Sequence, residues 1–498
     1  MKPAPRHSHD SNPAAAVRDG ALAAELATLV PLGEVISEGG RLRDACSDAT
    51  ESRGLRGATA ALVLPGSAAE VAAVMAWCYE RDVPIFTRGG GTGLAGGAVP
   101  DGGIVLSLEG MHAIRAVDPG QWRMEAEAGV RTARVQRVAR ENGLLFPPDP
   151  GAGEQSTLGG NIATNAGGPH AFKYGVTGSW VTGLEVVLPP GDVVTIGGPV
   201  RKDVAGFDLL HLMTGSEGTL GVITAAWLRL VPAPEAQTIV VGFYDDVESG
   251  CSAVADVMGS GLQPAVLEYL DAGALAASIG SFPFAAPGDP AFAVIAEVDG
   301  SAAEVEAAAT EVVAAMSAAA VGDALRLSGR RDARSLWGWR DGVSIAVNAQ
   351  RGGKVSEDIV VPVDRLADAI RGTLAIGERH GLPACSWGHA GDGNIHASFL
   401  IEPGNGDELA RAERAAGETF DLAIELGGSI SGEHGIGSLK TGWVEPALGP
   451  ALVRAQGEIK RTFDPKLLLN PGKKVPIAGP RDAGATESGP GGGRAGVR

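Results

Sequence analysis

Cysteine is scarce in this sequence. The 498 residues include four cysteines, Cys46, Cys78, Cys251 and Cys385, and none forms a CxxC pair. A disulfide framework is not expected at this density, and neither is a cysteine-ligated iron–sulfur cluster. Reduced thiols are the simpler interpretation, and they favour a cytoplasmic location.

Long apolar runs and positive charge are also lacking. No uninterrupted apolar run reaches the ~18 residues of a membrane-spanning helix, and Met1–Asn12 has no apolar core of a signal peptide. Lys and Arg total 41 against 59 Asp and Glu, which gives a formal net charge of -18. This balance argues against a nucleic-acid partner, because phosphate binding needs a basic surface. Any association with a membrane is therefore expected to be peripheral.

The chain is long enough for more than one domain. At roughly 100–200 residues per domain, its length allows about two to four domains, and 44% hydrophobic residues is ordinary for a globular protein. Pro232 and Pro234 interrupt the pattern near the middle. We predict disordered ends at 1–20 and 477–498, a first domain at 21–235 and a second domain at 236–476.

The first domain contains a strand–helix–strand unit that ends in glycine. Residues 61–64 are typical of a buried strand, and Ser67 with Glu70 three residues later predicts a capping box for the next helix. A strand at 83–87 then leads into the glycine-dense loop 88–97. A loop of this composition can bring bare backbone close to a ligand.

Strands and helices alternate along the rest of the chain. In the first domain we predict a helix at 132–142 and strands at 104–108, 123–128, 184–188, 193–196 and 222–230. In the second we predict strands at 238–243, 264–269, 292–298, 354–361 and 384–386, and helices at 246–260, 302–319, 364–380 and 407–426. This pattern favours an α+β second domain with an antiparallel sheet.

The first domain contains three glycine-dense segments, at 88–97, 157–168 and 215–221. Gly91-x-Gly93-x-x-Gly96 has the spacing of the Rossmann fingerprint, but that motif must open a helix, and here Pro100 and more glycines follow. Consecutive amides without side chains can instead form an anion-binding nest. Three such segments favour a long, flat ligand against the backbone. Three unrelated hairpins are the alternative that the residues leave open.

Two histidines flank a turn in the second domain. Asp392–Asn394 has the residues of a tight turn, which can bring His389 and His396 together. Paired imidazoles suit a divalent transition metal such as zinc, and Glu433 and His434 offer a carboxylate and a third imidazole. Histidine pairs near turns are more often not metal sites, and residues 433–434 can also belong to a solvated loop. The residues alone leave these interpretations open.

Seven motifs occur in an order that resembles a known family: PIFTRGGGTGLAGG, STLGGNIATNAGG, VTGLEVVLPPGDVV, LMTGSEGTLGVIT, GHAGDGNIH, SGEHGIG and NPGK. They are similar to the FAD-linked oxidases of the vanillyl-alcohol-oxidase (PCMH-type) superfamily, in the branch of D-lactate, glycolate and D-2-hydroxyglutarate dehydrogenases. The resemblance covers about residues 57–476. It implies an α+β fold, with a PCMH-type FAD-binding domain of two subdomains before an α+β cap domain that has an antiparallel sheet and C-terminal helices.

The resemblance also implies which residues contact FAD. Those in the first glycine loop would wrap the pyrophosphate, those at 157–165 would lie near the isoalloxazine, and those at 217–223 would close around the adenine and ribose. The residues assigned in this way are Arg88, Gly89, Gly90, Gly91, Thr92, Gly93, Gly96, Pro150, Thr157, Gly160, Asn161, Thr164, Asn165, Glu217, Gly218, Ile223 and Asn470. The first glycine loop has no His or Cys, so noncovalent FAD is expected.

The second-domain motifs imply the chemistry. In the family the Glu of the SGEHGIG motif is a metal ligand and the next His is the catalytic base. Carried over, His389, His396 and Glu433 hold a divalent metal, with zinc the expected ion. His434 takes the hydroxyl proton of a 2-hydroxy acid, and its Cα hydride passes to flavin N5.

Arg340 is expected to bind the substrate carboxylate, because Arg suits a bidentate contact and this residue occupies the position of a family arginine. A helix-surface arginine is the alternative. Ser344 and Lys354 are weaker candidates, since the hydroxyglutarate branch has Thr at the first position and Lys354 is displaced relative to the EDIVVP segment that follows it. These departures favour D-lactate or glycolate over D-2-hydroxyglutarate.

The predicted function is FAD-dependent oxidation of a small D-2-hydroxy acid to the 2-oxo acid. The alternatives are a flavin-using transferase of the alkylglycerone-phosphate synthase type, a non-catalytic flavin-binding subunit of a glycolate oxidase complex, and a flavin-free zinc hydrolase. The electron acceptor is expected to be a cytochrome, a quinone, an electron-transfer flavoprotein or oxygen, and a homodimer is left open.

Overall fold

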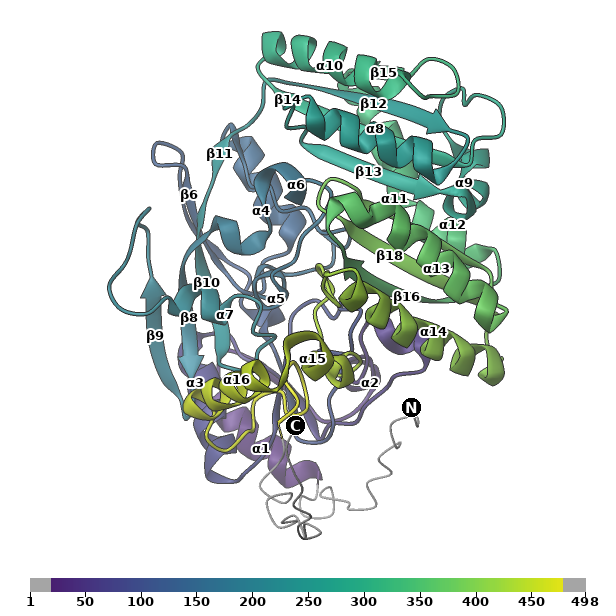
Figure 1. Ribbon diagram of the computed structural model, residues 1–498. Helices are drawn as coiled ribbons and strands as arrows, with labels where there is room; N and C mark the ends of the chain where they lie inside the picture. Colours follow the sequence, from purple (N-terminus) through teal and green to yellow (C-terminus); the bar gives the residue numbers. More distant parts are fainter. Residues whose placement is uncertain (1–18, 478–498) are drawn as a thin grey trace, which may run out of the picture.

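The computed structural model describes residues 19–477 (Figure 1). The ends predicted to be disordered, 1–20 and 477–498, lie outside the described residues, apart from the two residues that open the first helix and residue 477. Within the described range, no helix is long and apolar enough to cross a membrane.

The first domain has two main sheets on one shared core. The smaller has the order β1-β2-β4-β3, with β2 and β3 parallel to β4. The larger is antiparallel, in the order β5-β6-β10-β8-β9, and β7 pairs with β11 beside it. The strands are β1 (Glu34–Ile36), β2 (Ala61–Leu64), β3 (Ile85–Arg88), β4 (Ile104–Ser107), β5 (Ile114–Asp118), β6 (Arg123–Glu127), β7 (Leu144–Leu145), β8 (Val181–Leu188), β9 (Asp192–Gly197), β10 (Val222–Arg229) and β11 (Val231–Pro232).

Helices of the first domain cover the sheets and support the glycine segments. They are α1 (Asp19–Leu29), α2 (Gly40–Asp44), α3 (Ala68–Glu80), α4 (Thr132–Glu141), α5 (Leu158–Thr164), α6 (Ala171–Tyr174) and α7 (Leu209–Met213). The predicted capping box of α3 is only half formed. Ser67 accepts a hydrogen bond from the Glu70 amide, but the Glu70 carboxylate accepts from the amides of Leu32 and Gly66 at 2.6 and 2.7 Å. Glu70 therefore joins the chain before β1 to the residue that precedes the N-cap of its own helix.

The second domain is built on one antiparallel sheet, as predicted. Its strands have the order β15-β12-β14-β13-β17-β18-β16. They are β12 (Ala236–Tyr244), β13 (Val266–Asp271), β14 (Phe292–Gly300), β15 (Leu325–Ser328), β16 (Gly353–Val360), β17 (Ala384–His389) and β18 (Asn394–Ile401). The helices are α8 (Val247–Gly259), α9 (Ala272–Ser278), α10 (Ala302–Ser317), α11 (Arg330–Asp341), α12 (Val343–Ala349), α13 (Leu366–His380) and α14 (Gly406–Glu425).

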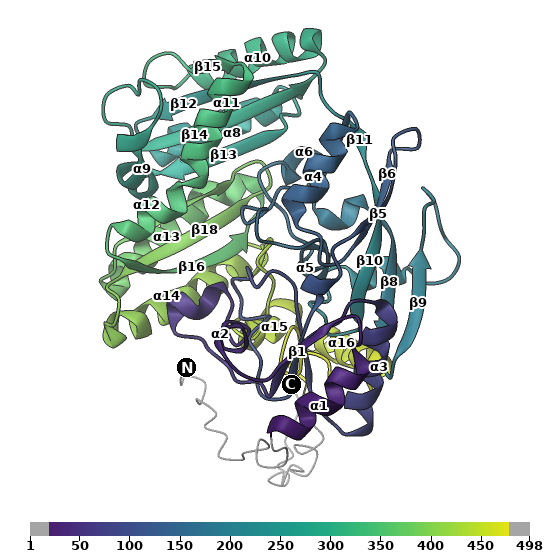
Figure 2. The same cartoon turned by 180° about the vertical axis from the view of Figure 1, so that it is seen from behind.

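Helices cover both faces of this sheet (Figures 1 and 2). Because side chains alternate along a strand, Val240 of β12 packs in one core with α8, α10, α13 and α14, and its neighbours Ile239 and Val241 pack in another with α9, α11 and α12. In β13, β16, β17 and β18 the second face carries polar side chains. It is this polar face that provides the second domain's part of the site.

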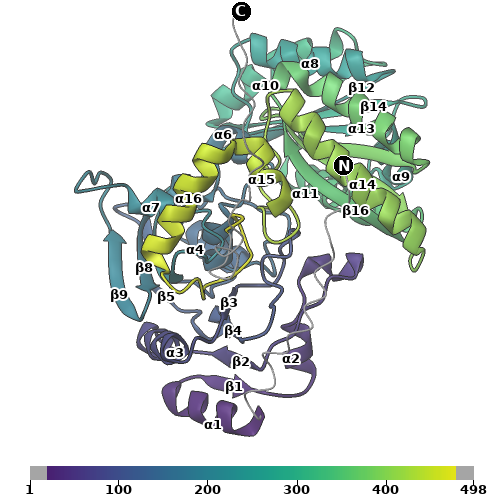
Figure 3. The same cartoon turned by 60° about the horizontal axis from the view of Figure 1, so that its bottom comes forward.

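Two C-terminal helices lead the chain from the second domain back to the first (Figure 3). They are α15 (Thr441–Leu448) and α16 (Pro450–Phe463). After α16, Leu469 forms a parallel bridge with Ile85 of β3, and the Asn470 amide donates to the Ile85 carbonyl at 2.8 Å. The end of the region expected to form the second domain therefore packs on the first domain.

Candidate active site

A cavity of about 560 Å³ lies between the two domains. This volume is within the range of small-molecule and cofactor sites. Fifteen of the predicted cofactor residues line it: Arg88, Gly89, Gly90, Gly91, Thr92, Gly93, Pro150, Thr157, Gly160, Asn161, Thr164, Glu217, Gly218, Ile223 and Asn470. From the second domain, Arg340, Ser344, Lys354, His396, Glu433 and His434 line the same cavity.

Two predicted cofactor residues do not line the cavity. The Gly96 carbonyl accepts a hydrogen bond from the Lys473 ammonium at 2.8 Å, and a Cβ on Gly96 would lie 2.6 Å from the Ser438 hydroxyl. Asn165 ends α5 with a φ of 54°, and its side chain accepts from the Gly178 amide at 2.8 Å. Both residues lie behind the lining residues and support the walls of the cavity.

The first two glycine segments pack against each other. A Cβ on Gly90 would lie 2.1 Å from the carbonyl oxygen of Gln155, and a Cβ on Gly89 would lie 2.6 Å from the Thr157 hydroxyl. Thr157 also caps α5, since its hydroxyl accepts from the Gly160 amide. Only glycine allows these loops to approach so closely, which leaves their backbones to face the cavity.

Glu217 lines the cavity and also contacts the second domain. Its carboxylate accepts from the amides of Ile436 and Gly437 at 2.9 and 2.7 Å and pairs with Lys474 at 3.0 Å. The Asn470 amide group donates to the Glu217 carbonyl at 2.6 Å. Glu217 thus joins the third glycine segment to the SGEHGIG loop of the second domain.

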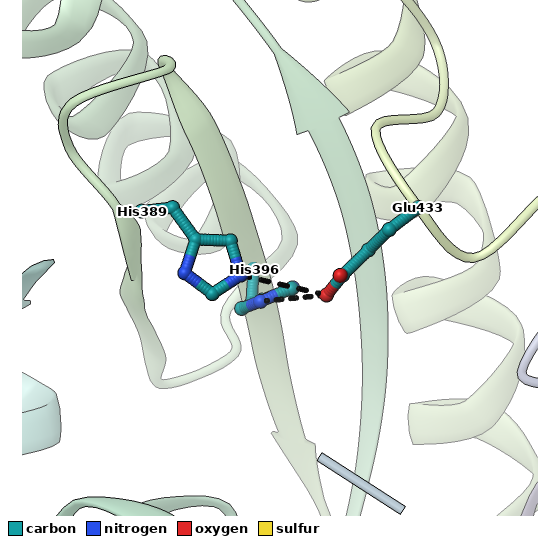
Figure 4. A group of neighbouring side chains, drawn as sticks. All are labelled: His389, His396 and Glu433. Atoms are coloured by element: carbon teal, nitrogen blue, oxygen red, sulfur yellow. Dashed lines mark ion pairs between the residues drawn. The ribbon is translucent and has the colours of Figure 1, made fainter. Parts of the chain in front are cut away.

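The predicted metal ligands converge (Figure 4). His389 ends β17 and His396 lies in β18, so the turn between the strands brings the rings to 5.4 Å, centroid to centroid. Their Nε2 atoms lie 3.6 and 3.5 Å from Glu433 Oε1, and the three ligand atoms all fall within 4.8 Å of one another.

The chemistry of this donor set fits a divalent ion. His389 Nε2 is buried and has no hydrogen-bond partner among the described residues, while its Nδ1 is bonded to the Glu268 carboxylate. An orphaned imidazole nitrogen that faces a second imidazole and a carboxylate is an arrangement typical of a zinc site with an open position. Burial would raise the pKa of Glu433, but the adjacent imidazoles of His389, His396 and His434 lower it to about 2.

His434 faces the cavity beside the metal set. Its ring is stacked on that of His396, with centroids 5.3 Å apart and planes at 13°, and its Nε2 lies 4.0 Å from Glu433 Oε1. The His434 imidazole is open to the cavity, whereas His389 does not line it. This position allows it to exchange a proton with a ligand next to the metal set.

Asp358 holds the loop that carries Glu433 and His434. One of its oxygens, Oδ2, accepts from the Ser431 hydroxyl at 2.9 Å and from the amides of Gly432, Glu433 and His434 at 2.8, 3.1 and 3.0 Å. Burial alone would raise the pKa of Asp358, but nearby positive charge and these bonds hold it well below its usual range.

Lys440, which follows the SGEHGIG motif, has a structural position. It is 1% exposed, and its ammonium donates to the carbonyls of Asp358 and Ile430 at 3.0 Å each. It therefore fastens the SGEHGIG loop to β16.

The three predicted substrate-binding residues form one wall. Arg340 comes from α11 and Ser344 from α12, and the Lys354 ammonium of β16 donates to the Ser344 hydroxyl at 2.7 Å. Lys354 also lies 4.6 Å from the centre of the Trp387 ring. Burial lowers the pKa of Lys354 to about 8.

Sequence reasoning missed Glu268, Asp358 and Trp387. Each lies on the polar face of the second sheet, and both acids are fully buried. A charged residue in the middle of an apolar strand such as AVLEYLD is a signal for a buried partner. Which partner it has depends on strand pairing, which a single sequence does not reveal.

Known proteins match both domains. A family described as FAD linked oxidases, C-terminal domain, matches residues 233–474, and one described as FAD binding domain matches 59–197. The chain is 36% identical over 417 residues to the glycolate oxidase subunit GlcD of Bacillus subtilis (strain 168), which covers 83% of this chain and 88% of that protein. The chain belongs to the FAD-linked oxidases.

Other relatives agree with this membership. The chain is 37% identical over 420 residues to a D-lactate dehydrogenase of Archaeoglobus fulgidus, which covers 83% of this chain and 91% of that protein. A crystal structure of p-cresol methylhydroxylase with substrate bound matches with a TM-score of 0.77 at 18% identity, covers 92% of this chain and 96% of that chain, and shows the fold alone. The PCMH-type α+β prediction is confirmed, and this FAD-linked oxidase is an oxidoreductase with FAD as its cofactor.

Proposed function

We propose that this FAD-linked oxidase oxidises a small D-2-hydroxy acid to the 2-oxo acid with the help of a bound divalent metal. The observation that carries the proposal is the shared cavity. The glycine segments of the FAD-binding domain line one side of it, and Arg340, His396, Glu433 and His434 line the other.

Arg340 and His434 of the second domain have separate roles in the proposed reaction. Arg340 binds the substrate carboxylate, since a guanidinium matches two carboxylate oxygens. His434 accepts the hydroxyl proton at Nε2, the nitrogen that faces Glu433. The substrate is thereby oriented with its Cα toward the FAD side of the cavity.

The two bound groups supply the remaining chemistry. A divalent ion, with zinc the expected one, would be held by His389, His396 and Glu433 and would supply a Lewis acid that favours loss of the hydroxyl proton. FAD supplies the acceptor of the hydride at N5. We propose that FAD is noncovalent, because no His, Cys or Tyr of the first domain lines the cavity within residues 19–477.

D-lactate and glycolate are the favoured substrates. The two relatives named above are called a glycolate oxidase subunit and a D-lactate dehydrogenase. D-2-hydroxyglutarate stays a candidate, because Lys354 and Ser344 line the wall next to Arg340 and can meet a second carboxylate.

The reduced flavin needs an acceptor outside the chain. We propose a cytochrome, a quinone or an electron-transfer flavoprotein, since no cysteine lines the cavity in the described part of the chain and the four thiols are unpaired. We further propose a cytoplasmic location, with any membrane contact peripheral, and leave a homodimer as the state to test by light scattering.

Anaerobic mixing with D-lactate, L-lactate, glycolate and D-2-hydroxyglutarate tests the proposal. We expect one of these acids, but not L-lactate, to remove the oxidised-flavin band at about 450 nm. The His434→Gln variant should retain FAD and slow bleaching by about 10²–10⁴-fold. Bleaching by none of the acids would contradict the proposal and favour the transferase or a flavin-binding subunit.

A further inference from the structure

Glu268 is a buried acid that touches two functional residues at once. It lies in β13, is 0% exposed, and is directly opposite His389 in the pairing of β13 with β17. Its Oε1 accepts from His389 Nδ1, and its Oε2 accepts from Arg340 Nε at 2.5 Å and forms an ion pair with Arg340 Nη2. One carboxylate therefore joins a strand of the metal site to the helix that carries the substrate arginine.

The alternation of side chains along β13 directs this carboxylate to the polar face of the sheet. Its neighbours in β13, Leu267 and Tyr269, point into the core under α8 and α13, so Glu268 points to the polar face. It does not line the cavity itself. Burial of an ionised carboxylate away from water costs free energy, and here the guanidinium of Arg340 and the imidazole of His389 offset that cost.

The contact to His389 decides which nitrogen is available for a metal. Because Nδ1 donates to Glu268, the ring presents the lone pair of Nε2, which is buried, has no partner in the described part of the chain, and faces Glu433 at 3.6 Å. A carboxylate behind a ligating histidine fixes its tautomer and orientation and makes it more basic toward the ion.

The contact to Arg340 decides which edge of the guanidinium is free. Nε and Nη2 are held by Glu268, and within residues 19–477 Nη1 has no hydrogen-bond partner. Arg340 is 8% exposed and lines the cavity, so Nη1 can bind a ligand there without a large change in the side-chain conformation. Pre-orientation of this kind lowers the entropy lost when a carboxylate binds.

We propose that Glu268 is a positioning residue that fixes His389 and Arg340 together, so that affinity for the metal and affinity for the substrate carboxylate depend on the same buried side chain. The inference rests on the function proposed above. It adds that the two affinities fall together when this one carboxylate is changed.

The test uses the FAD-loaded chain and the variant Glu268→Gln, which keeps the shape but loses the charge and one acceptor. Zinc affinity, measured by competition with a chromophoric chelator, should fall about 10–100-fold. Affinity for oxalate, an unreactive dianion followed by its perturbation of the flavin spectrum, should fall about tenfold or more. FAD content should stay unchanged, because Glu268 does not line the cavity.

Asp271→Asn is the matched control. Asp271 lies in the same strand β13, is 1% exposed, and bonds to Ser386 and the Ala274 amide instead of to the site. Its zinc and oxalate affinities should match those of the wild type. Glu268→Asp keeps the charge but is too short to reach both partners, so it serves if Glu268→Gln does not fold, and it should show losses in the same two affinities.

The outcomes separate the inference from the proposed function. A wild-type chain that binds no zinc would overturn the metal part of the proposed function and the inference with it. A wild type that binds zinc, with a folded Glu268 variant that keeps either affinity at the wild-type value, would overturn the inference alone. Joint loss in the variant with an unaffected control would support it.

Discussion

At the scale of single residues, the site depends on buried carboxylates behind the groups that face the cavity. Glu268 orients Arg340 and His389, and Asp358 gathers the amides of residues 432–434 on one oxygen. Neither acid could be identified from the sequence, although Glu433, His434 and the paired histidines could. Glu433, His434 and the paired histidines belong to sequence motifs. The partners of Glu268 and Asp358 depend on strand pairing, which a single sequence does not reveal.

The first prediction concerns Asp358. Asp358→Asn replaces one acceptor that serves four donors by a neutral amide, so the loop bearing His434 should shift. A displacement of about 1 Å can cost 10²-fold in rate, and we expect a loss of about that size in anaerobic flavin bleaching.

Asp271→Asn is the control for this prediction. Asp271 is 1% exposed, belongs to the same sheet, and bonds to Ser386 and the Ala274 amide away from the cavity. Bleaching by this variant should stay near the wild-type rate. An Asp358→Asn variant that bleaches as fast as the control would show that the loop does not depend on this carboxylate.

At the scale of elements, the β17–β18 hairpin brings together the two histidines of the proposed metal site. The turn at 392–394 was predictable from its residues, and so were the long periodic helices such as α3, α10, α13 and α14. Helix α5 was not, because glycines at 159 and 160 argue against a helix that here begins at a Thr157 cap and ends at Asn165. Helices α11, α12, α15 and α16 were also missed, since short or polar helices give weak periodicity.

The second prediction concerns Gly393 in this hairpin. Its φ is 74°, and a Cβ there would lie 1.9 Å from the Val361 carbonyl oxygen. Gly393→Ala should therefore displace the turn, lower the free energy of unfolding by about 1–3 kcal/mol, and weaken zinc binding in chelator competition. Gly404→Ala shares the strained backbone, with a φ of 81°, but its Cβ would meet nothing within 4 Å. Equal zinc affinity in the two variants would contradict the account.

At the scale of the whole molecule, the cavity exists because the two domains are held together. His170 of the first domain bonds to Asp149 at 2.6 Å and reaches Glu297 of the second domain at 3.2 Å. Tyr174 donates to Asp299 at 2.6 Å, and Arg53 pairs with Glu357 at 2.6 Å. The return of α16 to the first domain could not be predicted from the sequence, because it depends on contacts between distant segments.

The third prediction follows from the charge of His170. Burial opposes its protonated form, but Asp149 and Glu297 outweigh burial and raise its pKa well above 6.5. The stabilisation is therefore complete below 6.5 and is lost as the pH rises through the higher pKa of the folded protein. His170→Gln should lower the free energy of unfolding by about 1–3 kcal/mol near pH 6 and by less near about pH 9.5.

Denaturant unfolding at the two pH values checks this prediction. His112 is exposed and bonds only to the Glu109 carbonyl, so His112→Gln is the control and should change stability little at either pH. A His170→Gln loss that grows with pH would contradict the assigned sign.

The central claim is that FAD, a metal set and a base act in one cavity on a D-2-hydroxy acid. The most direct test is anaerobic bleaching of the FAD-loaded chain by its best acid, before metal removal, after removal with a chelator, and after zinc is restored. We predict fast bleaching, loss of at least about 10²-fold on removal, and recovery with zinc while FAD stays bound throughout. Bleaching at the full rate in a chain shown to hold no metal would contradict the claim.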